Sequence, residues 1–294
     1  IQNAGAAVGI DTTLIPQLSN IEVINVTNSN AIDTINDNNE LILELAGTSG
    51  ITTVGSIASS DGVTFNNMES VPDLTIKSPA NGTVEVNMNL AALSGASDQS
   101  TITVSGTGAG LDIAYTDDGV AATAASSVLE TVEIVSQSVA NTINDLQLDA
   151  VGTTTLKISG DKKLTISTAT DATVAVIDGS ASSGGFTLAD ISFASPTVTG
   201  GAGADTITAV GGGATESYSM GGGNDSVDFA NTFTGTDVYD GGDGVDTLIV
   251  GTDGFSNAGT ASTISAGLSN VEVLSLTAAG TISLESDTSI NTIA

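Results

Sequence analysis

Two nine-residue segments of this chain share a pattern that constrains the fold more than any other feature of the sequence. Each begins with two glycines and has a third glycine at position four, an aspartate at position six and an apolar residue at position eight. They cover residues 200–208 and 241–249. A third segment, 220–228, lacks only the first glycine, and a degenerate fourth covers 232–240. We interpret each segment as a six-residue turn followed by a short strand.

The residue types in these turns suit a calcium ion. Glycine permits a positive φ and lets backbone carbonyls approach an ion without interference from a Cβ. Carboxylate and carbonyl oxygens, with no nitrogen or sulfur ligand, select hard cations such as Ca²⁺, which takes about six to eight oxygens. Stacked turns would combine the aspartate of one coil with carbonyls of the next. The predicted calcium-site residues are Gly200, Gly201, Ala202, Gly203, Asp205, Gly221, Gly222, Gly223, Asp225, Gly235, Asp237, Gly241, Gly242, Asp243, Gly244 and Asp246.

An alternative interpretation is that these segments are ordinary hairpin turns, which have the same composition. Hairpins do not explain the apolar residue two positions after each aspartate. These apolar residues are Ile207, Val227, Tyr239 and Leu248. The four aspartates are separated by 20, 12 and 9 residues, so insertions are expected at 209–219 and 230–231. The number of ions is therefore not predicted.

Composition excludes several classes of function. The chain has 34 acidic residues against four lysines, a formal charge of −30, and contains no histidine, cysteine, arginine or tryptophan. Without histidine there is no Ser-His-Asp triad and no His-Glu-x-x-His metal site, and without cysteine there is no thiolate nucleophile. A body of this charge is a poor partner for nucleic acid. No apolar run approaches the roughly 20 residues of a membrane span. We predict no enzymatic activity, no nucleic-acid partner and no membrane insertion.

The excess of acidic groups also indicates where the protein works. Like charges at this density repel one another and oppose compaction. Because four lysines cannot neutralise them, the opposing charge is expected to come from solution. Weak calcium binding at many turns is useful only where calcium is abundant, as outside the cell. The sequence therefore predicts an extracellular location.

The rest of the chain predicts short β-strands. Alternating apolar and polar residues, as at 102–104 and 164–166, recur about every ten residues between Gly, Asn, Asp and Ser. We predict an all-β fold with the character of a right-handed parallel β-solenoid, or β-roll. That character is clearest in the calcium-binding region, 197–250. The β-rich region before it, 1–196, is either a less regular solenoid or a β-sandwich, and the β-rich repeat continues over 251–294.

A second repeat lies outside the glycine-rich turns. Leu-Ser-Asn-Ile-Glu-Val at 18–23 returns as Leu-Ser-Asn-Val-Glu-Val at 268–273, with looser copies at 129–134 and 68–71. The glutamates at the shared position are interpreted as solvated strand faces; they are Glu22, Glu133 and Glu272. Because similar segments occur near both ends, the sequence is expected to be a piece of a longer repetitive protein. One helix is predicted, over 120–129.

The nonapeptides resemble those of RTX proteins, which Gram-negative bacteria export by type I secretion. Among these, the chain resembles the RTX-type surface-layer proteins. Those share its cysteine-free composition, rich in Thr, Ala, Gly, Ser and Val, and its strands introduced by Leu-x-Asn-Val-Glu. The calcium motif covers only 200–249, and the composition extends the resemblance more loosely over the chain. The resemblance implies Ca²⁺ as the bound ion, a lattice of copies on the cell exterior, a surface polysaccharide as partner of the full-length protein, and a C-terminal secretion signal outside this segment.

By position, Asp205, Asp225 and Asp246 match the ligand aspartate of that family, and Asp237 matches where Thr232 and Phe233 replace two glycines. We predict a calcium-dependent structural protein of a bacterial surface layer. The alternative is a type I secreted calcium-binding adhesin or biofilm matrix protein. A glycosidase that uses two carboxylates on a β-helix stays formally open. Six phenylalanines and three tyrosines offer little to line its sugar cleft.

Overall fold

The computed structural model describes most of the chain, and every structural statement concerns these residues. The described residues are 2–3, 12–16, 18–29, 40–78, 82–107, 110–117, 128–148, 151–169, 173–191, 193, 197–209, 215–230, 232–233, 236–251, 267–277 and 292–293. The chain forms two compact units, 1–156 and 157–294, and each is described by itself.

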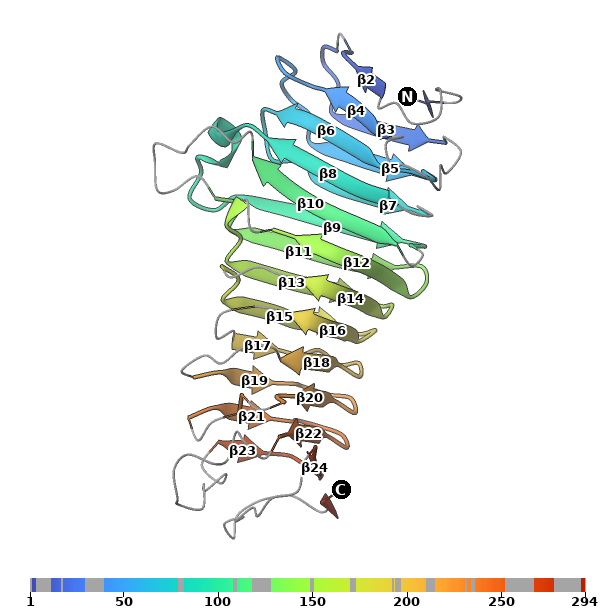
Figure 1. Cartoon of the computed structure of the whole chain (residues 1–294). Helices are drawn as coiled ribbons and strands as arrows, with labels where there is room; N and C mark the ends of the chain where they lie inside the picture. Colours follow the sequence, from blue (N-terminus) through green and yellow to red (C-terminus); the bar gives the residue numbers. More distant parts are fainter. Residues whose placement is uncertain are drawn as a thin grey trace. The chain divides into compact units, whose positions relative to one another are not determined.

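The first unit consists of two parallel sheets whose strands alternate along the chain (Figure 1). One sheet has the order β1-β3-β5-β7-β9-β11 and the other β2-β4-β6-β8-β10-β12. The first sheet contains β1 (Gln2–Asn3), β3 (Val23–Asn28), β5 (Thr53–Ile57), β7 (Asp73–Lys77), β9 (Gln99–Ser105) and β11 (Thr131–Gln137). The second contains β2 (Thr12–Leu14), β4 (Leu41–Glu44), β6 (Val63–Met68), β8 (Gly82–Met88), β10 (Leu111–Asp117) and β12 (Asn141–Gln147). A short 3₁₀ helix, η1 (Leu90–Leu93), follows β8.

The second unit repeats this arrangement with shorter strands. Its sheets have the orders β13-β15-β17-β19-β21-β23 and β14-β16-β18-β20-β22-β24-β25. The first contains β13 (Thr155–Gly160), whose first two residues belong to the first unit, β15 (Val176–Ser182), β17 (Thr197–Thr199), β19 (Ser217–Ser219), β21 (Val238–Asp240) and β23 (Leu268–Ser269). The second contains β14 (Leu164–Ala169), β16 (Phe186–Ile191), β18 (Thr206–Ala209), β20 (Ser226–Asp228), β22 (Thr247–Val250), β24 (Val273–Leu276) and β25 (Thr292–Ile293). Each coil thus gives one strand to each sheet.

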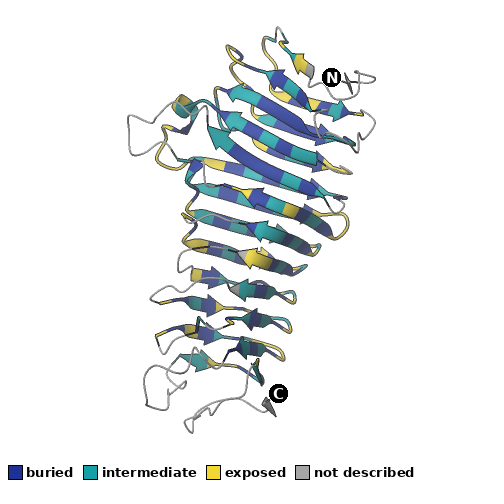
Figure 2. Cartoon of the chain, viewed as in Figure 1, coloured by how far each residue is buried: buried dark blue, intermediate teal, exposed yellow. Residues whose placement is uncertain are grey.

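Alternating side chains explain why these segments form coils. In β9, Ile102 and Val104 are fully buried, whereas the threonine between them is partly exposed. Ile102 pairs in register with Leu74 of β7 and Ile134 of β11, so equivalent apolar residues stack from coil to coil. Figure 2 shows the resulting alternation of buried and more exposed positions along the strands. Because the apolar side chains of both sheets face inward, they form the core.

The all-β parallel solenoid predicted from the sequence is confirmed, and a sandwich is wrong for the region before 197, because its strands pair in parallel between successive coils. The helix predicted at 120–129 falls mainly outside the described residues, and the described part of it, 128–129, is not helical. The domain boundaries predicted at residues 196 and 250 are defined by the sequence motifs, and they stay a prediction. No helix among the described residues has the length and apolar character needed to cross a membrane.

Candidate metal centre

Three predicted ligands lie at the beginnings of adjacent strands in one sheet of the second unit. Asp205, Asp225 and Asp246 stand directly before β18, β20 and β22, and the residues that follow them pair in register. The intervals of 20 and 21 residues between them are the lengths of single coils. The three side chains are therefore stacked one coil apart. All three are buried, with exposed fractions of 0%, 1% and 0%.

Hydrogen bonds connect these carboxylates through the main chain. The N–H of Asp205 donates to Oδ1 of Asp225, and the N–H of Asp225 donates to Oδ1 of Asp246, both at 2.8 Å. At the ends, Phe186 N–H donates to Oδ1 of Asp205, and Asp246 N–H donates to Oε2 of Glu272, also at 2.8 Å. We call Asp205, Asp225, Asp246 and Glu272 the carboxylate ladder. Each member thus accepts a hydrogen bond from the main chain of the preceding coil, at or directly before the first residue of a strand.

The Oδ2 atoms of the three aspartates differ in their hydrogen bonding. Oδ2 of Asp205 accepts a hydrogen bond from the N–H of Gly201 at 2.8 Å. Oδ2 of Asp225 and Oδ2 of Asp246 are buried and have no hydrogen-bond partner in the described part of the chain. A buried carboxylate oxygen without a donor is costly, so such groups normally bind a cation or accept hydrogen bonds. These two oxygens are the strongest indication of a ligand.

Glycines give the two later turns a shape that the first turn lacks. Four of them adopt a positive φ: Gly221 (87°), Gly223 (132°), Gly242 (90°) and Gly244 (147°). Gly201 and Gly203, at the matching places of the first turn, do not. A Cβ on Gly242 would lie 2.0 Å from the carbonyl oxygen of Gly221. Only glycine therefore allows the carbonyls of stacked turns to crowd together here.

The glycine at position one borders an unpartnered oxygen. A Cβ on Gly241 would lie 2.8 Å from Oδ2 of Asp246 and 2.0 Å from the carbonyl oxygen of Asn270. A side chain at residue 241 would thus fill the space where a carboxylate and a carbonyl oxygen meet. No three acidic side chains converge on one point among the described residues, so main-chain carbonyls would have to supply further ligands. The all-oxygen donor set, the buried unpartnered oxygens and the glycine cradle fit Ca²⁺.

Most of the other predicted site residues lie in the glycine-rich turns that precede these strands. Asp243 and Ala202 are exposed at position three of their turns, and Asp243 joins the turns only through a main-chain bridge to Gly222. Asp243 is therefore an exposed residue and not a member of the buried ladder. Gly200 donates its N–H to the carbonyl of Ser219. Gly235 lies outside the described residues.

Asp237 lies in the other sheet, directly before the odd-numbered strand β21. It is buried, and its Oδ1 accepts a hydrogen bond from the N–H of Glu216 at 2.9 Å. Glu216 is also buried, at 2% exposure, directly before β19. The nonapeptide pattern misses Glu216 because glutamate replaces aspartate at position six of the segment 211–219 and Ala214 replaces the glycine at position four. Two signals in the sequence could have revealed it: the glycines at 211–213, and a distance of 21 residues from Asp237 that equals the distance between Asp225 and Asp246.

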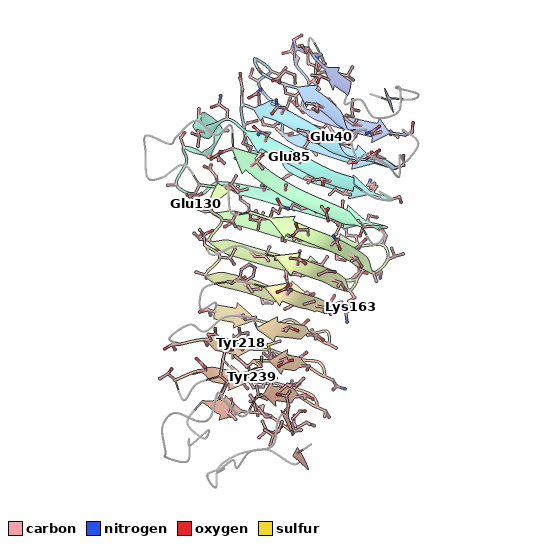
Figure 3. The ribbon with its side chains drawn as sticks, viewed as in Figure 1. Glu40, Glu85, Glu130, Lys163, Tyr218 and Tyr239 are labelled. Atoms are coloured by element: carbon pink, nitrogen blue, oxygen red, sulfur yellow. The ribbon has the colours of Figure 1, made fainter. Side chains whose placement is uncertain are left out.

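Glu272 corrects an expectation from the sequence. It is half-buried, and its carboxylate occupies the last place of the ladder instead of only facing solvent as a strand residue. Glu130, in a looser copy of the same repeat, acts similarly in the first unit (Figure 3), where its Oε2 accepts the N–H of Asp98 at 2.7 Å. Glu22 is exposed and Glu133 partly exposed. A glutamate before a strand can therefore take the place of a ladder aspartate.

Burial controls the acidity of the ladder. Burial raises the pKa of Asp205 to about 6, and burial with the neighbouring charges of Asp205 and Asp246 raises the pKa of Asp225 to about 7. Burial and the charges of Glu272, Asp240 and Asp243 raise the pKa of Asp246 as well. Without a cation, these groups favour protonation at a pH where free carboxylates are ionised.

These pKa shifts predict that the cation-free protein loses stability as pH rises. The folded chain holds protons on Asp205 and Asp225 that the unfolded chain has released above its ordinary pKa of 3.8. This stabilisation is fully present below about pH 4 and is lost as pH rises through about 6 to 7. We expect a higher thermal midpoint near pH 5 than near pH 8, measured by circular dichroism in buffer freed of divalent ions. A midpoint that rises over this interval would contradict the assignment.

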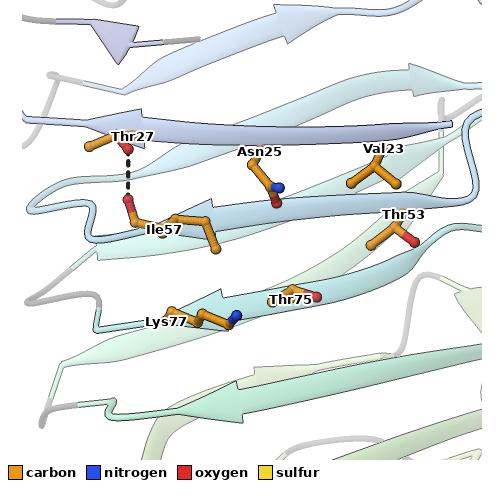
Figure 4. A pocket seen from close by; sticks show the side chains of 7 residues that line it. All are labelled: Val23, Asn25, Thr27, Thr53, Ile57, Thr75 and Lys77. Carbon is orange, nitrogen blue, oxygen red and sulfur yellow. Dashed lines mark hydrogen bonds between the residues drawn. The ribbon is translucent and has the colours of Figure 1, made fainter. Parts of the chain in front are cut away.

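The first unit has a hollow on the outer face of its odd-numbered sheet (Figure 4). Val23, Asn25, Thr27, Thr53, Ile57, Thr75 and Lys77 line it. It exists because β5 has a glycine at its centre: a Cβ on Gly55 would lie 2.4 Å from Oδ1 of Asn25. The hollow offers hydroxyl, amide and ammonium groups, but no buried side-chain atom without a partner faces it. It indicates a specific ligand less clearly than the ladder does.

Comparison of the chain with protein-family models, curated proteins and solved structures finds no match.

Proposed function

We propose that the chain is a calcium-dependent structural protein of a bacterial surface layer that self-assembles on the cell exterior. The observation that carries the calcium part is the pair of buried, unpartnered oxygens, Oδ2 of Asp225 and Oδ2 of Asp246, in stacked glycine turns. These two carboxylates and main-chain carbonyls of the turns would hold the ion. A bound Ca²⁺ supplies positive charge where the coils otherwise bring buried carboxylates together.

Charge supports the same proposal. The chain carries 34 acidic residues and four lysines, and its single ion pair among the described residues joins the adjacent Asp161 and Lys162 at the surface. Four lysines cannot balance 34 acidic residues, so most of the carboxylates need cations from solution to stay close together. Because the ladder forms only when the coils are stacked, cation binding favours the folded state over the unfolded chain.

The step from calcium binding to a lattice rests on the resemblance to surface-layer proteins. That resemblance lies in the composition, the nonapeptides and the Leu-Ser-Asn-Val-Glu segments. It implies that copies of the protein associate with one another and that a surface polysaccharide is a partner. A solenoid supports it in one respect, because repeated coils present similar outer faces over a long surface. A secreted adhesin shares the calcium chemistry but would bind its target through a separate module.

A titration with two readouts tests the proposal. The chain would be freed of divalent ions, then titrated with Ca²⁺, and in parallel with Mg²⁺, while far-UV circular dichroism and sedimentation velocity are recorded. We expect Ca²⁺, and not Mg²⁺, to compact the partly folded cation-free chain further, increase the β signal and then drive ordered association. Compaction without association would favour the adhesin. No response at millimolar Ca²⁺ would remove the calcium assignment and, with it, the main support for a surface layer.

A further inference from the structure

Tyr239 is a buried tyrosine whose hydroxyl lacks a partner. It lies on β21 (Figure 3) with an exposed fraction of 0%, and its hydroxyl oxygen is buried without a hydrogen bond to any described residue. Buried tyrosines normally pair this group. Tyr115 of the first unit, equally buried, shares a hydrogen bond of 2.7 Å with Oγ of Ser100. The hydroxyl of Tyr239 is therefore an exception that needs a cause.

The chain places Tyr239 beside the ladder. It precedes the turn 241–246 on one strand, and Asp246 ends that turn directly before the other strand. Burial raises the pKa of Tyr239 far above its usual value, and the negative charges of Asp246 and Asp225 raise it further. The phenol is thus neutral and keeps its proton. For Tyr218, one coil earlier, the charges concerned are Glu216 and Asp237 instead.

We propose that Tyr239 is a positioning residue of the cation site, with its hydroxyl donating a hydrogen bond to an oxygen that ligates the bound ion. This rests on the proposed function, because it assigns a further residue to the same site. Three buried oxygens lack partners: Oδ2 of Asp225, Oδ2 of Asp246 and the hydroxyl of Tyr239. Gly241, two residues after Tyr239, borders this site, because a Cβ on it would lie 2.8 Å from Oδ2 of Asp246. Two of them need positive charge, and the third needs an acceptor.

A cation satisfies all three together. The ion takes the carboxylate oxygens as ligands, and the hydroxyl donates to a carboxylate or to a water molecule among the ligands. The phenol donates without losing its proton, so no covalent bond forms or breaks. Tyr239 therefore orients the ligands from the opposite sheet. This places a positioning residue outside the glycine-rich turn, on the strand that enters it.

Terbium luminescence tests this role, because Tb³⁺ replaces Ca²⁺ and is excited by energy transfer from a nearby tyrosine. The chain has only three tyrosines and no tryptophan, so the donor can be identified by substitution. We expect Tyr239→Phe to remove most of the sensitised emission and to weaken Ca²⁺ binding about tenfold, as loss of a hydrogen bond to a charged group does. The matched control Tyr115→Phe should leave both unchanged.

Direct excitation of Tb³⁺ shows whether the ion is still bound in Tyr239→Phe, and circular dichroism in cation-free buffer shows whether the variant folds. Because phenylalanine keeps the ring and removes only the unpartnered hydroxyl, the cation-free stability should not fall. If wild-type protein binds Ca²⁺ but Tyr239→Phe binds it equally well, the role of Tyr239 is wrong and the proposed function stands. If the wild type itself binds neither ion, the proposed function fails.

Discussion

The variant Asp225→Asn is expected to bind calcium about a hundredfold more weakly, a loss of about 2.7 kcal/mol, and yet to be more stable than the wild type without calcium at neutral pH. The asparagine carbonyl can still accept the N–H of Asp205, so the hydrogen bond between the coils is kept. The charge that ligates the ion is lost. In the cation-free protein that same charge is buried near Asp205 and Asp246, so its removal relieves both burial and repulsion.

Calorimetric titration with Ca²⁺ measures the first effect, and urea denaturation in cation-free buffer at pH 7.5 measures the second. Asp228→Asn is the matched control. Asp228 lies three residues further on, in β20, is partly exposed, and accepts the N–H of Ala230 at 2.8 Å outside the ladder. It should change neither quantity by more than a few tenths of a kcal/mol. Equal effects of the two substitutions would show that net charge, and not the ladder, determines calcium binding.

A methyl group at residue 244 is expected to disrupt the stacked turns. Gly244 has a φ of 147°, which side chains avoid, and its Cβ would lie 1.6 Å from the carbonyl oxygen of Gly223. Neither backbone can move without disturbing the turn of the adjacent coil. We expect Gly244→Ala to lower the free energy of unfolding by about 3 kcal/mol or more, measured by urea denaturation in the presence of calcium.

Gly222→Ala provides the matched control for that substitution. Gly222 sits in the preceding turn, does not adopt a positive φ, and its Cβ would have no neighbour closer than 4.0 Å. Alanine restricts the unfolded chain, so this variant should be neutral or more stable by up to about 1 kcal/mol. If Gly244→Ala were tolerated as well as Gly222→Ala, the close stacking of the turns would be wrong.

Local alternation was sufficient to predict the fold class. Strand β9, for example, follows from the alternation of apolar Ile102 and Val104 with the polar residues that flank them. The pairing partners of a strand do not follow from such local patterns. They depend on the length of each coil, which varies with the connections between strands. For this reason the sequence left a sandwich open before 197, although successive coils there pair in parallel.

The sequence predicts only part of the ladder, because the length of each coil varies. Asp225 and Asp246 were found because each belongs to a glycine-rich turn of fixed length. The sequence interpretation places Asp237 in the same series as the other aspartates, with an insertion at 230–231, whereas the structure places Asp237 directly before a strand of the other sheet, with Glu216. Glu272 was interpreted as a surface residue because local alternation does not reveal that a longer side chain reaches a neighbouring coil.

Turn length can change from one coil to the next without disturbing the strands. The six-residue turn 241–246 and the three-residue turn 270–272 occupy equivalent places, with Asp240 paired to Ser269 before them and Thr247 paired to Val273 after them. The longer side chain of Glu272 reaches the same N–H position that an aspartate reaches from the longer turns. The proposed dependence on a cation is in this sense a property of single coils. Deletion or duplication of a few codons can remove or add it during evolution while the remaining coils keep their register.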